Sequence, residues 1–357
     1  MQETQRQWPT ISIIVVNLNG KKWLKGLLES ILASDYPEDK LEIVFVDNGS
    51  SDGSVEFAKK MFKNNANSKI IQNTLNVGWS PANNQGMSVA KGEIVVCISN
   101  DMEVETSWIK EIAKVMKADK NIGLVQCNSL SMWDRRTPDS GMNYLDRFGY
   151  AYSYAPLKET LEVFFAEGMA FAVKQEVIKK IGVLDEYFFM EYDDMDYSWR
   201  ARLAGYKVFF VPTAKVYHAR GGTVGATYFQ RINNVKWYTR NHLVTLIKNY
   251  ELKTLLKLSA VILAVEMIKI LYLLIIKKNW KLSTAASKGM FYVLKDLRVI
   301  LKKRIEIQKS RKISDKEIMK AMHPFNPWLL RLFLVLQAKG KRLAITTKLP
   351  MNEVKKK

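Results

Sequence analysis

The sequence predicts an α/β fold with a mostly parallel central sheet, followed by basic amphipathic helices toward the C-terminal end. Two observations carry this prediction. Over the first 130 residues, short apolar runs rich in β-branched residues alternate with segments of helical periodicity, which is typical of a parallel sheet covered by helices on both faces. The last third of the chain consists of long segments that are both apolar and basic.

The strands of the first half are predicted from continuous apolar runs, since strands buried on both faces need no polar side. They span residues 10–16, 41–47, 69–73, 93–99 and 122–126. Helices are predicted between them from the spacing of apolar residues, at residues 21–34, 54–62, 80–92 and 106–118. The third of these helices has proline in its first turn and ends at glycine, which are the expected end signals.

The second half of the sheet region is less regular. A helix is predicted from Asp194 to Leu203, with strands around it at residues 164–174, 207–212 and 214–218. From about Tyr228 the pattern changes to long helices that continue to about Lys320. We therefore expect a sheet domain at residues 1–227 and a basic helical tail at residues 228–357.

Basic charge is concentrated in the tail. The formal net charge is +20, and residues 251–357 hold 25 basic and 7 acidic side chains, against 30 and 28 in the rest of the chain. Such an excess predicts a polyanionic partner, either nucleic acid or an anionic membrane surface. No nucleic-acid motif is visible, and the apolar content exceeds what phosphate contacts require. We therefore expect a membrane surface and no nucleic acid.

Residues 255–276 are apolar and long enough to span a bilayer. Lys257, Glu266 and Lys269 lie within them, and charges in mid-bilayer are costly. An amphipathic helix lying in the membrane interface fits better, with a buried bundle helix as the alternative. Residues 298–312 and 323–342 repeat the pairing of apolar and basic side chains. We expect a peripheral protein on the cytoplasmic face of the cell membrane.

The two cysteines favour a reducing compartment. Cys97 and Cys127 lie in predicted strands, so buried thiols are expected rather than a disulfide. The first ten residues are polar and contain no apolar segment of a secretory signal.

Polar loops follow four of the predicted strands. In parallel sheets ligands bind beyond the carboxyl ends of the strands, so these loops predict a polar pocket along one edge. They are Asn17–Gly20, Asp47–Gly53, Asn76–Asn84 and Ser99–Glu103. Neither GxGxxG after the first strand nor GxxxxGK[ST] anywhere is present, which argues against a dinucleotide fingerprint and a P-loop.

Asp47 and Asp101 lie at the ends of buried strands. Each taken alone is a turn or cap residue. The functional alternative for Asp47 is to accept a hydrogen bond from a nucleotide base. For Asp101, with Glu103 two residues on, the alternative is to bind a hard divalent cation together with phosphate oxygens of a substrate.

The stretch EYDDMDYSWR places Glu191, Asp193, Asp194 and Asp196 among aromatic residues. Crowded carboxylates and apolar neighbours raise carboxyl pKa values, which suits a general base. Asp193 and Asp196 could instead cap the first turn of the helix. That structural role is the favoured one for Asp196 and is evenly balanced against a functional one for Asp193.

These segments, taken in order, resemble family 2 glycosyltransferases, the inverting nucleotide-sugar enzymes with the GT-A fold. The matching stretches are ISIIVVNLNGKKWLKGLLESI, EIVFVDNGSSDGS, NVGWSPANNQGM, GEIVVCISNDMEV, EGMAFAVKQEVIKKIGVLDEYFFMEYDDMDYSWRARLAGYKV and AKVYHARGGT. Within the family they look most like the rhamnosyltransferase branch. The resemblance implies a nucleotide-sugar-binding half at residues 1–127 and an acceptor and catalytic half at residues 128–227.

The resemblance assigns roles to individual residues. Asp194 is the expected general base, with Asp193 beside it in the acidic pair. Asp101 is the last acid of the D-x-D metal motif, with His218 and Ser99 as further candidate ligands for Mg²⁺ or Mn²⁺. The expected nucleotide-sugar-binding residues are Asn17, Asn19, Asp47, Asn76, Gly78, Asn83, Asn100 and Asp101. The expected acceptor-side residues are Glu167, Gly168 and Arg200.

Two departures from the family pattern bear on function. Ser99 replaces the first acid of D-x-D, and a hydroxyl is a weaker ligand for a hard cation. The Q-x-x-R-W motif of processive synthases is absent, so we expect transfer of a single sugar. The predicted activity is transfer of a sugar, with rhamnose as the candidate, from a UDP- or dTDP-sugar to a polyprenyl-linked glycan acceptor. A nucleotidyltransferase, or a catalytically inactive membrane-surface protein that keeps the fold, is the alternative.

Overall fold

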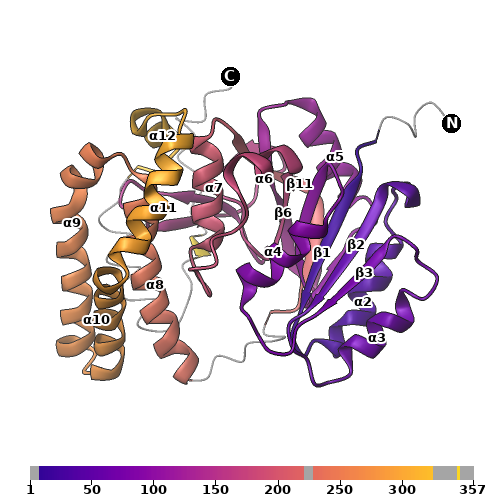
Figure 1. Cartoon of the computed structure of the whole chain (residues 1–357), viewed down its shortest axis with the longest axis horizontal. Helices are drawn as coiled ribbons and strands as arrows, with labels where there is room; N and C mark the ends of the chain where they lie inside the picture. The colour runs from indigo at the N-terminus through magenta and orange to yellow at the C-terminus, as the bar shows by residue number, and fades with distance from the viewer. Residues whose placement is uncertain (1–7, 221–227, 325–343, 346–357) are drawn as a thin grey trace.

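The computed structural model describes residues 8–220, 228–324 and 344–345. Figure 1 shows a twisted sheet with helices on both faces, beside a group of long helices. The strand order of the central sheet is β3-β2-β1-β4-β10-β6-β11-β5, with β9 paired to β11. Its strands are β1 (Ile11–Asn17), β2 (Leu41–Asp47), β3 (Ser68–Gln72), β4 (Ile94–Ser99), β5 (Met102–Val104), β6 (Ile122–Ser131), β9 (Leu161–Glu162), β10 (Ala170–Lys174) and β11 (Lys207–His218).

The sheet is mixed, with parallel pairing predominant. Strands β3, β2, β1 and β4 are parallel neighbours, and β11 is parallel to β6. Strand β10 lies antiparallel between β4 and β6. The register places Asn17 opposite Asp47 and Val16 opposite Ser99. The predicted fold class is confirmed, and the polar ends of the first strands meet at one edge.

Alternate residues of β1 pack into different cores because strand side chains alternate between faces. Ile11, Ile13 and Val15 join one cluster with residues of α2 (Lys21–Leu32) and α5 (Trp108–Ala118). Ile14 and Val16 join the other, with residues of α4 (Trp79–Val89), α7 (Asp193–Leu203) and α8 (Tyr228–Asn249). Helices α3 (Ser54–Met61) and α6 (Gln175–Ile181) and the short 3-10 helix η1 (Glu38–Lys40) also lie in the described part of the sheet domain.

The structure departs from the predicted elements mainly in the second half. The predicted strands at 207–212 and 214–218 are one strand with an irregularity between Val211 and Lys215. The predicted strand at 164–174 is shorter, Ala170–Lys174. A small sheet of β7 (Met142–Leu145), β8 (Ala151–Tyr154) and β12 (Ala344–Ile345) was not predicted. The first two of these strands are short and mix polar with aromatic residues, so they lack the apolar run that signals a buried strand.

The described part of the tail is helical as far as Lys320, as expected, and it is continuous with the sheet domain's core. It contains α8, α9 (Leu252–Leu271) with its π-helical end η2 (Tyr272–Ile276), α10 (Trp280–Lys295), α11 (Leu297–Ser310) and α12 (Asp315–Lys320). Val244, Leu246 and Tyr250 of this region are buried in the same cluster as Trp199 and Phe210. The predicted apolar segment 323–342 lies almost wholly outside the described residues.

Candidate functional site

A buried amide and carboxylate network joins the ends of β1, β2 and β4. Asn17 Nδ2 donates to Asp47 Oδ1 at 3.0 Å, and Asn100 Nδ2 donates to Asn17 Oδ1 at 2.8 Å. Asp47 Oδ2 accepts from the backbone N–H groups of Gly49 and Ser50. Asp47 is fully buried, so in this structure its carboxylate holds the polar loop after β2 in place.

Asn48 holds the loop after β3 in place, as Asp47 holds the loop after β2. Its Nδ2 donates to Asn76 Oδ1 at 2.8 Å and to the carbonyl of Gly78 at 3.2 Å. Asn76 Oδ1 also accepts from Gly78 N–H. Gly78 has φ +101°, and a Cβ there would lie 3.0 Å from the ring of Phe189. The backbone at this position therefore requires glycine.

Two further donor-side candidates differ in their bonding. Asn19 Oδ1 accepts from Ser51 N–H at 2.9 Å, which braces the loop after β1 against the loop after β2. Asn83 lies on α4 and donates to the carbonyl of Trp79 at 3.0 Å. Its Oδ1 is buried and accepts no hydrogen bond from the described residues, and buried polar atoms usually have a partner.

Asp101, His218 and Asp139 form a line of side chains at the end of β4. Asp101 Oδ2 lies 3.3 Å from His218 Nε2, and His218 Nδ1 lies 2.8 Å from Asp139 Oδ2. Ser99 Oγ donates to Asp101 Oδ1 at 2.9 Å. Burial raises the pKa of the Asp101 carboxyl, but His218 and the Ser99 hydroxyl outweigh that effect and hold it below its usual value.

These residues have the chemistry of a cation site that is completed by a substrate. No group of three or more His, Cys, Asp or Glu side chains in the described part of the chain is arranged to hold a metal ion by itself. Asp139 on Nδ1 nevertheless directs Nε2 of His218 toward Asp101, the usual arrangement behind a metal-binding imidazole. One carboxylate and one imidazole fit a divalent cation that takes its other ligands from a diphosphate.

Asp194 lies at the start of α7 with its carboxylate held by backbone N–H groups. Gly168 N–H donates to Oδ2 at 2.9 Å, and Met195 N–H donates to Oδ1 at 2.7 Å. Burial, the charge of Asp193 and the charge of Glu167 raise the pKa of Asp194 well above its usual range, against the two N–H donors. Glu167 and Gly168, the expected acceptor-side residues, therefore lie next to Asp194.

The other acids of the stretch have different surroundings. Asp193 Oδ2 accepts from Ser80 Oγ at 3.3 Å, and burial raises the pKa of Asp193 to about 6. Asp196 is not a cap, contrary to the sequence-based expectation. Its carboxylate pairs with Arg200 and Lys248 and accepts from Asn249. Helix α7 begins without a side-chain cap.

Arg200 is occupied by structural contacts. Its Nε donates to Asp196 Oδ2 at 2.9 Å, and its Nη atoms donate to the carbonyls of Ile181 and Val183. The side chain is 8% exposed. The resemblance assigned it to the acceptor side, behind Asp194 on the same helix. In the structure it lies on that helix and joins α7 to the end of α6 and the loop that follows.

The loop that carries Asp101 and the loop beside Asp194 are joined by a backbone hydrogen bond. Ser99 N–H, two residues before Asp101, donates to the carbonyl of Met169 at 2.9 Å, and Met169 follows Gly168. Helix α4 starts directly after Gly78, and its Ser80 contacts Asp193. One edge of the sheet therefore carries the buried amide network, a candidate cation position and a candidate base.

Sequence reasoning missed three supporting residues. Asp139 lies in the irregular region after β6, where no motif marks it. Asn48 follows Asp47 in a loop that was already singled out, and Ser80 occupies the first turn of α4. A preference for polar side chains next to the assigned residues could have found the last two.

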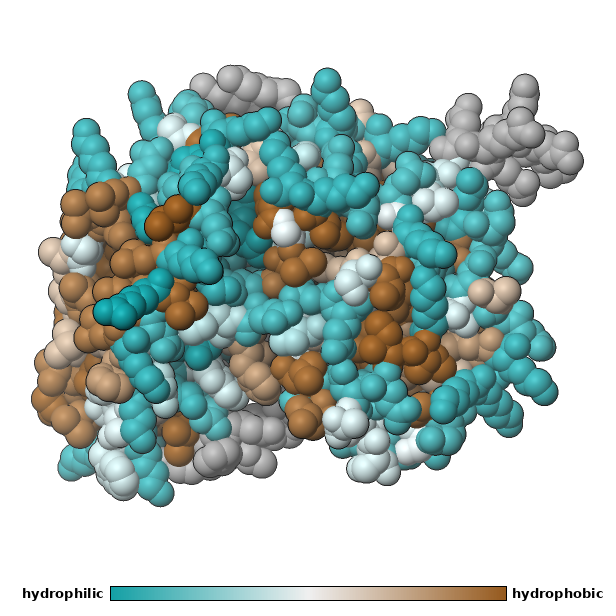
Figure 2. Space-filling view, in the orientation of Figure 1, coloured by the Kyte–Doolittle hydropathy of each residue, from teal (hydrophilic) through white to brown (hydrophobic). Residues whose placement is uncertain are grey.

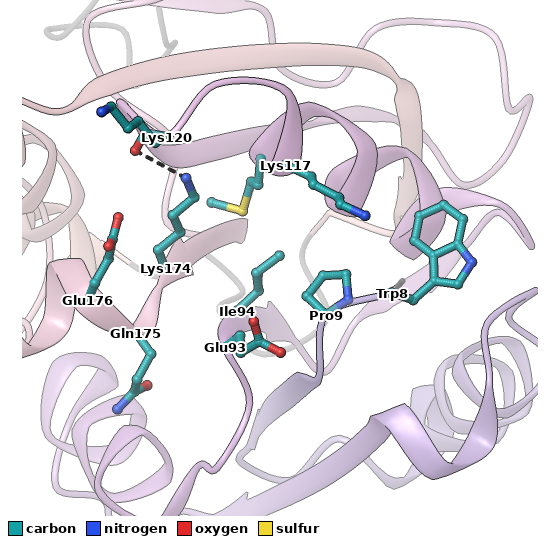
Figure 3. Close-up of a pocket in the computed structure, with 10 residues that line it drawn as sticks. Trp8, Pro9, Glu93, Ile94, Lys117, Lys120, Lys174, Gln175 and Glu176 are labelled. Atoms are coloured by element: carbon teal, nitrogen blue, oxygen red, sulfur yellow. Dashed lines mark hydrogen bonds between the residues drawn. The ribbon is translucent and has the colours of Figure 1, made fainter. Parts of the chain in front are cut away.

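The cavity drawn in Figure 3 is not part of this edge. It is lined by Trp8, Pro9, Glu93, Ile94, Met116, Lys117, Lys120, Lys174, Gln175 and Glu176. Ile94 begins β4 whereas Ser99 ends it. A strand rises about 3.3 Å per residue, so Ile94 and Ser99 are roughly 16 Å apart. The cavity therefore lies at the opposite end of β4 from Asp101.

Comparison with known sequences identifies the domain. Residues 12–182 match the profile of glycosyl transferase family 2. This segment is similar to glycosyl transferase family 2 domains. Poly-β-1,6-N-acetyl-D-glucosamine synthase of Staphylococcus epidermidis is 26% identical over 272 residues, covering 75% of this chain and 63% of that protein. The Staphylococcus aureus (strain COL) enzyme of the same name is 25% identical over 240 residues, covering 66% and 55%.

The chain spans less than two thirds of the length of these relatives. They are named as N-acetylglucosamine polymer synthases, not as the rhamnosyltransferases that the sequence alone suggested. The predicted resemblance to family 2 is thereby confirmed, and the resemblance to the rhamnosyltransferase branch is not.

Solved structures show the same GT-A fold. GalNAc-T7 with UDP, GalNAc and Mn²⁺ aligns with a TM-score of 0.57 at 18% identity, covering 68% of this chain and 48% of that one. The Pyrobaculum calidifontis mannosyltransferase PcManGT with GDP-Man and Mn²⁺ aligns at 0.52 and 19% identity, covering 86% and 87%. Staphylococcus aureus TarS with UDP-GlcNAc aligns at 0.53 and 20% identity, covering 67% of each chain.

Proposed function

We propose that the family 2 domain is an inverting glycosyltransferase that moves one sugar from a nucleotide-sugar to a hydroxyl of a glycan acceptor, with Asp194 as the general base. The observation that carries the proposal is the setting of Asp194. Its half-buried carboxylate is fixed by two backbone N–H donors, and the loss of solvent together with the neighbouring acids raises its pKa. A general base requires a fixed position and a raised pKa of this kind.

The reaction divides between two ends of the site. The acceptor hydroxyl forms a bond to the anomeric carbon, its proton passes to Asp194, and the bond to the diphosphate oxygen breaks with its electron pair on the leaving group. A bound divalent cation would supply charge neutralisation for that leaving group. Asp101 and His218 are the residues that would hold it, with Asp139 orienting the imidazole and Ser99 hydrogen-bonded to Asp101.

The donor that we propose is a UDP- or dTDP-sugar. Its nucleotide is proposed to be contacted or supported by Asn17, Asn19, Asp47, Asn76, Gly78, Asn83 and Asn100. Structures with the same fold contain UDP or UDP-GlcNAc in two cases and GDP-Man in a third, so the fold itself does not select the base. UDP-GlcNAc, suggested by the relatives, and dTDP-rhamnose, suggested by the sequence, are the donors to test first.

The acceptor that we propose is a glycan carried on a polyprenyl lipid at the cytoplasmic membrane face. Two features support it: the excess of basic residues in the tail and one described helix, Leu252–Ile276, that is long and apolar enough to cross a membrane. The absence of Q-x-x-R-W supports transfer of one sugar rather than polymerisation.

The test is release of nucleoside diphosphate from a panel of donors, with and without Mn²⁺, by wild type and Asp194→Asn. We expect one uridine or thymidine donor to be turned over by wild type, and the variant to lose turnover by at least 100-fold while keeping nucleotide affinity within a few-fold. Glu186→Gln, an acid on the loop before α7, is the control. Full activity of Asp194→Asn would refute the base assignment.

A further inference from the structure

We propose that α9 with η2 lies flat in the surface of an anionic bilayer, as a docking face that leaves both of its ends on the same side of the membrane. This inference deepens the proposed membrane association by stating which surface binds and in which orientation. It does not depend on the identity of the sugar, because binding to vesicles is measured without substrate.

The outward side of this helix is apolar along most of its length. From Ala260 to Ile276, every solvent-exposed residue is apolar. The larger ones are between 45 and 66% exposed: Val261, Leu263, Met267, Ile268, Leu271, Leu274, Ile275 and Ile276. At 1.5 Å per residue the stripe is roughly 25 Å long. Figure 2 shows the brown surface that gathers over α9 and α10 at the left of the molecule.

The charges inside the segment face the protein. Glu266 is fully buried against His242 of α8 at 3.1 Å, and Lys269 Nζ donates to Thr239 Oγ1 at 2.9 Å. Glu266 and Lys269 also pair with each other. These residues therefore do not prevent the opposite face of the helix from entering a membrane, and they fix which face points outward.

A crossing orientation is disfavoured by the neighbours of α9. Helices α8 and α10 pack on the inner side of the same unit, so a span would carry them into the bilayer. Helix α10 exposes Lys288 and Lys295 next to Phe291 and Leu294. Mid-bilayer lysines are costly, whereas at the headgroup level they are favourable.

Basic residues flank the apolar stripe at both ends. Lys253 and Lys257 are exposed near its start, and Lys277 and Lys278 are exposed after its end. With α9 in the plane of the membrane, all four ammonium groups reach the headgroup layer together. Such an arrangement is complementary to anionic lipids, and it distinguishes a bilayer from an uncharged apolar partner.

The first experiment is co-flotation of the full chain with vesicles of phosphatidylcholine alone or with 30% phosphatidylglycerol. We expect binding that is at least tenfold stronger with phosphatidylglycerol and weaker at high salt. Combined replacement of Met267, Leu271 and Ile275 by Gln should abolish it. The matched control is Leu32→Gln, at an exposed apolar site on α2. Wild type that fails to bind, or a triple variant that binds normally, would overturn the docking face.

The second experiment determines orientation and does not require the triple variant to fold. Cys97 and Cys127 are buried, so Lys253→Cys, Lys277→Cys and Lys59→Cys each introduce one exposed thiol. A membrane-impermeant maleimide is applied to right-side-out and inverted vesicles from cells that express the chain. We expect all three sites to react from the same side. Labelling of residues 253 and 277 from opposite sides would show a span and refute the proposal.

Discussion

Lys248 of α8 has its ammonium nitrogen 3.0 Å from Asp196 Oδ1, on the helix that begins with Asp193 and Asp194. The same ammonium contacts Asp185, and both carboxylates are buried. The tail therefore supplies the cation that balances acids beneath the proposed base. The loop before α7 is held in the same way, since Asn241 Nδ2 donates to the carbonyls of Met190 and Glu191.

Replacing Lys248 by Met should destabilise the fold strongly, because it leaves Asp185 and Asp196 buried with less compensating charge. We expect a loss of roughly 3–5 kcal/mol in the free energy of unfolding. Lys303→Met is the control, since Lys303 also pairs with Asp185 but is 33% exposed, and about 1 kcal/mol or less is expected. Denaturant unfolding of both variants measures the difference. Equal effects would contradict the importance of Lys248.

Asp139→Asn should weaken metal binding through His218. The amide cannot hold the imidazole in the same orientation or raise its basicity as a carboxylate does, so we expect a 10- to 100-fold loss of Mn²⁺ affinity in the presence of nucleotide. Asp119→Asn, at the exposed end of α5, is the control. Titration calorimetry with Mn²⁺ measures it. Unchanged affinity would show that Asp139 does not support a metal ligand.

Asp193→Asn should move the acid limb of the pH–rate profile to lower pH. The charge of Asp193 is the second largest cause, after burial, of the raised pKa of Asp194. Removing it lowers that pKa, so Asp194 ionises and acts as a base at lower pH. The measurement is kcat/KM against pH for wild type and variant. A limb that stays in place would mean that another group controls it.

The same substitution should change the pH dependence of stability. The pKa of Asp193 is about 6 in the folded chain and 3.8 as the ordinary value. A carboxyl whose pKa is raised by folding contributes stability below its unfolded pKa and loses that contribution as pH rises through its folded pKa. Asp193→Asn should therefore gain stability relative to wild type as the pH rises from about 4 to about 6, by up to roughly 3 kcal/mol, and keep that advantage at higher pH. Melting curves across this range test it, and a constant difference would contradict it.

Gly49→Ala should damage the donor side of the site. Gly49 has φ +85°, and a Cβ there would lie 2.8 Å from backbone atoms of Leu75. Gly182→Ala is the control, since Gly182 has φ +79° with no neighbour within 4 Å. Gly182 also has ψ −170°, and strain alone in this region costs about 1–3 kcal/mol. The control should lose that much and Gly49→Ala distinctly more, with weaker UDP binding. Thermal unfolding and UDP titration measure both effects, and equal losses would refute the close approach.

Local pattern was sufficient for the sheet domain. The apolar runs of β1, β2 and β4 and the apolar faces of α2 and α5 are buried as predicted. Strands buried on both faces consist of continuous apolar residues, and helices that cover a sheet repeat apolar residues at helical spacing. The strand-end positions of Asn17, Asp47 and Asp101 follow from the same pattern, since parallel strands bring their carboxyl ends to one edge.

Tertiary structure decided the partners of these residues. Asp139 lies opposite His218, and Lys248 lies beneath Asp196, although each pair is separated by about 50 to 80 residues in the sequence. The spacing of residues along the sequence does not indicate which distant side chain neutralises a buried acid. For the same reason, the sequence alone suggests that the charges of Glu266 and Lys269 oppose membrane insertion. Only the packing of α9 against α8 shows that these two residues face inward and leave the apolar side of the helix exposed.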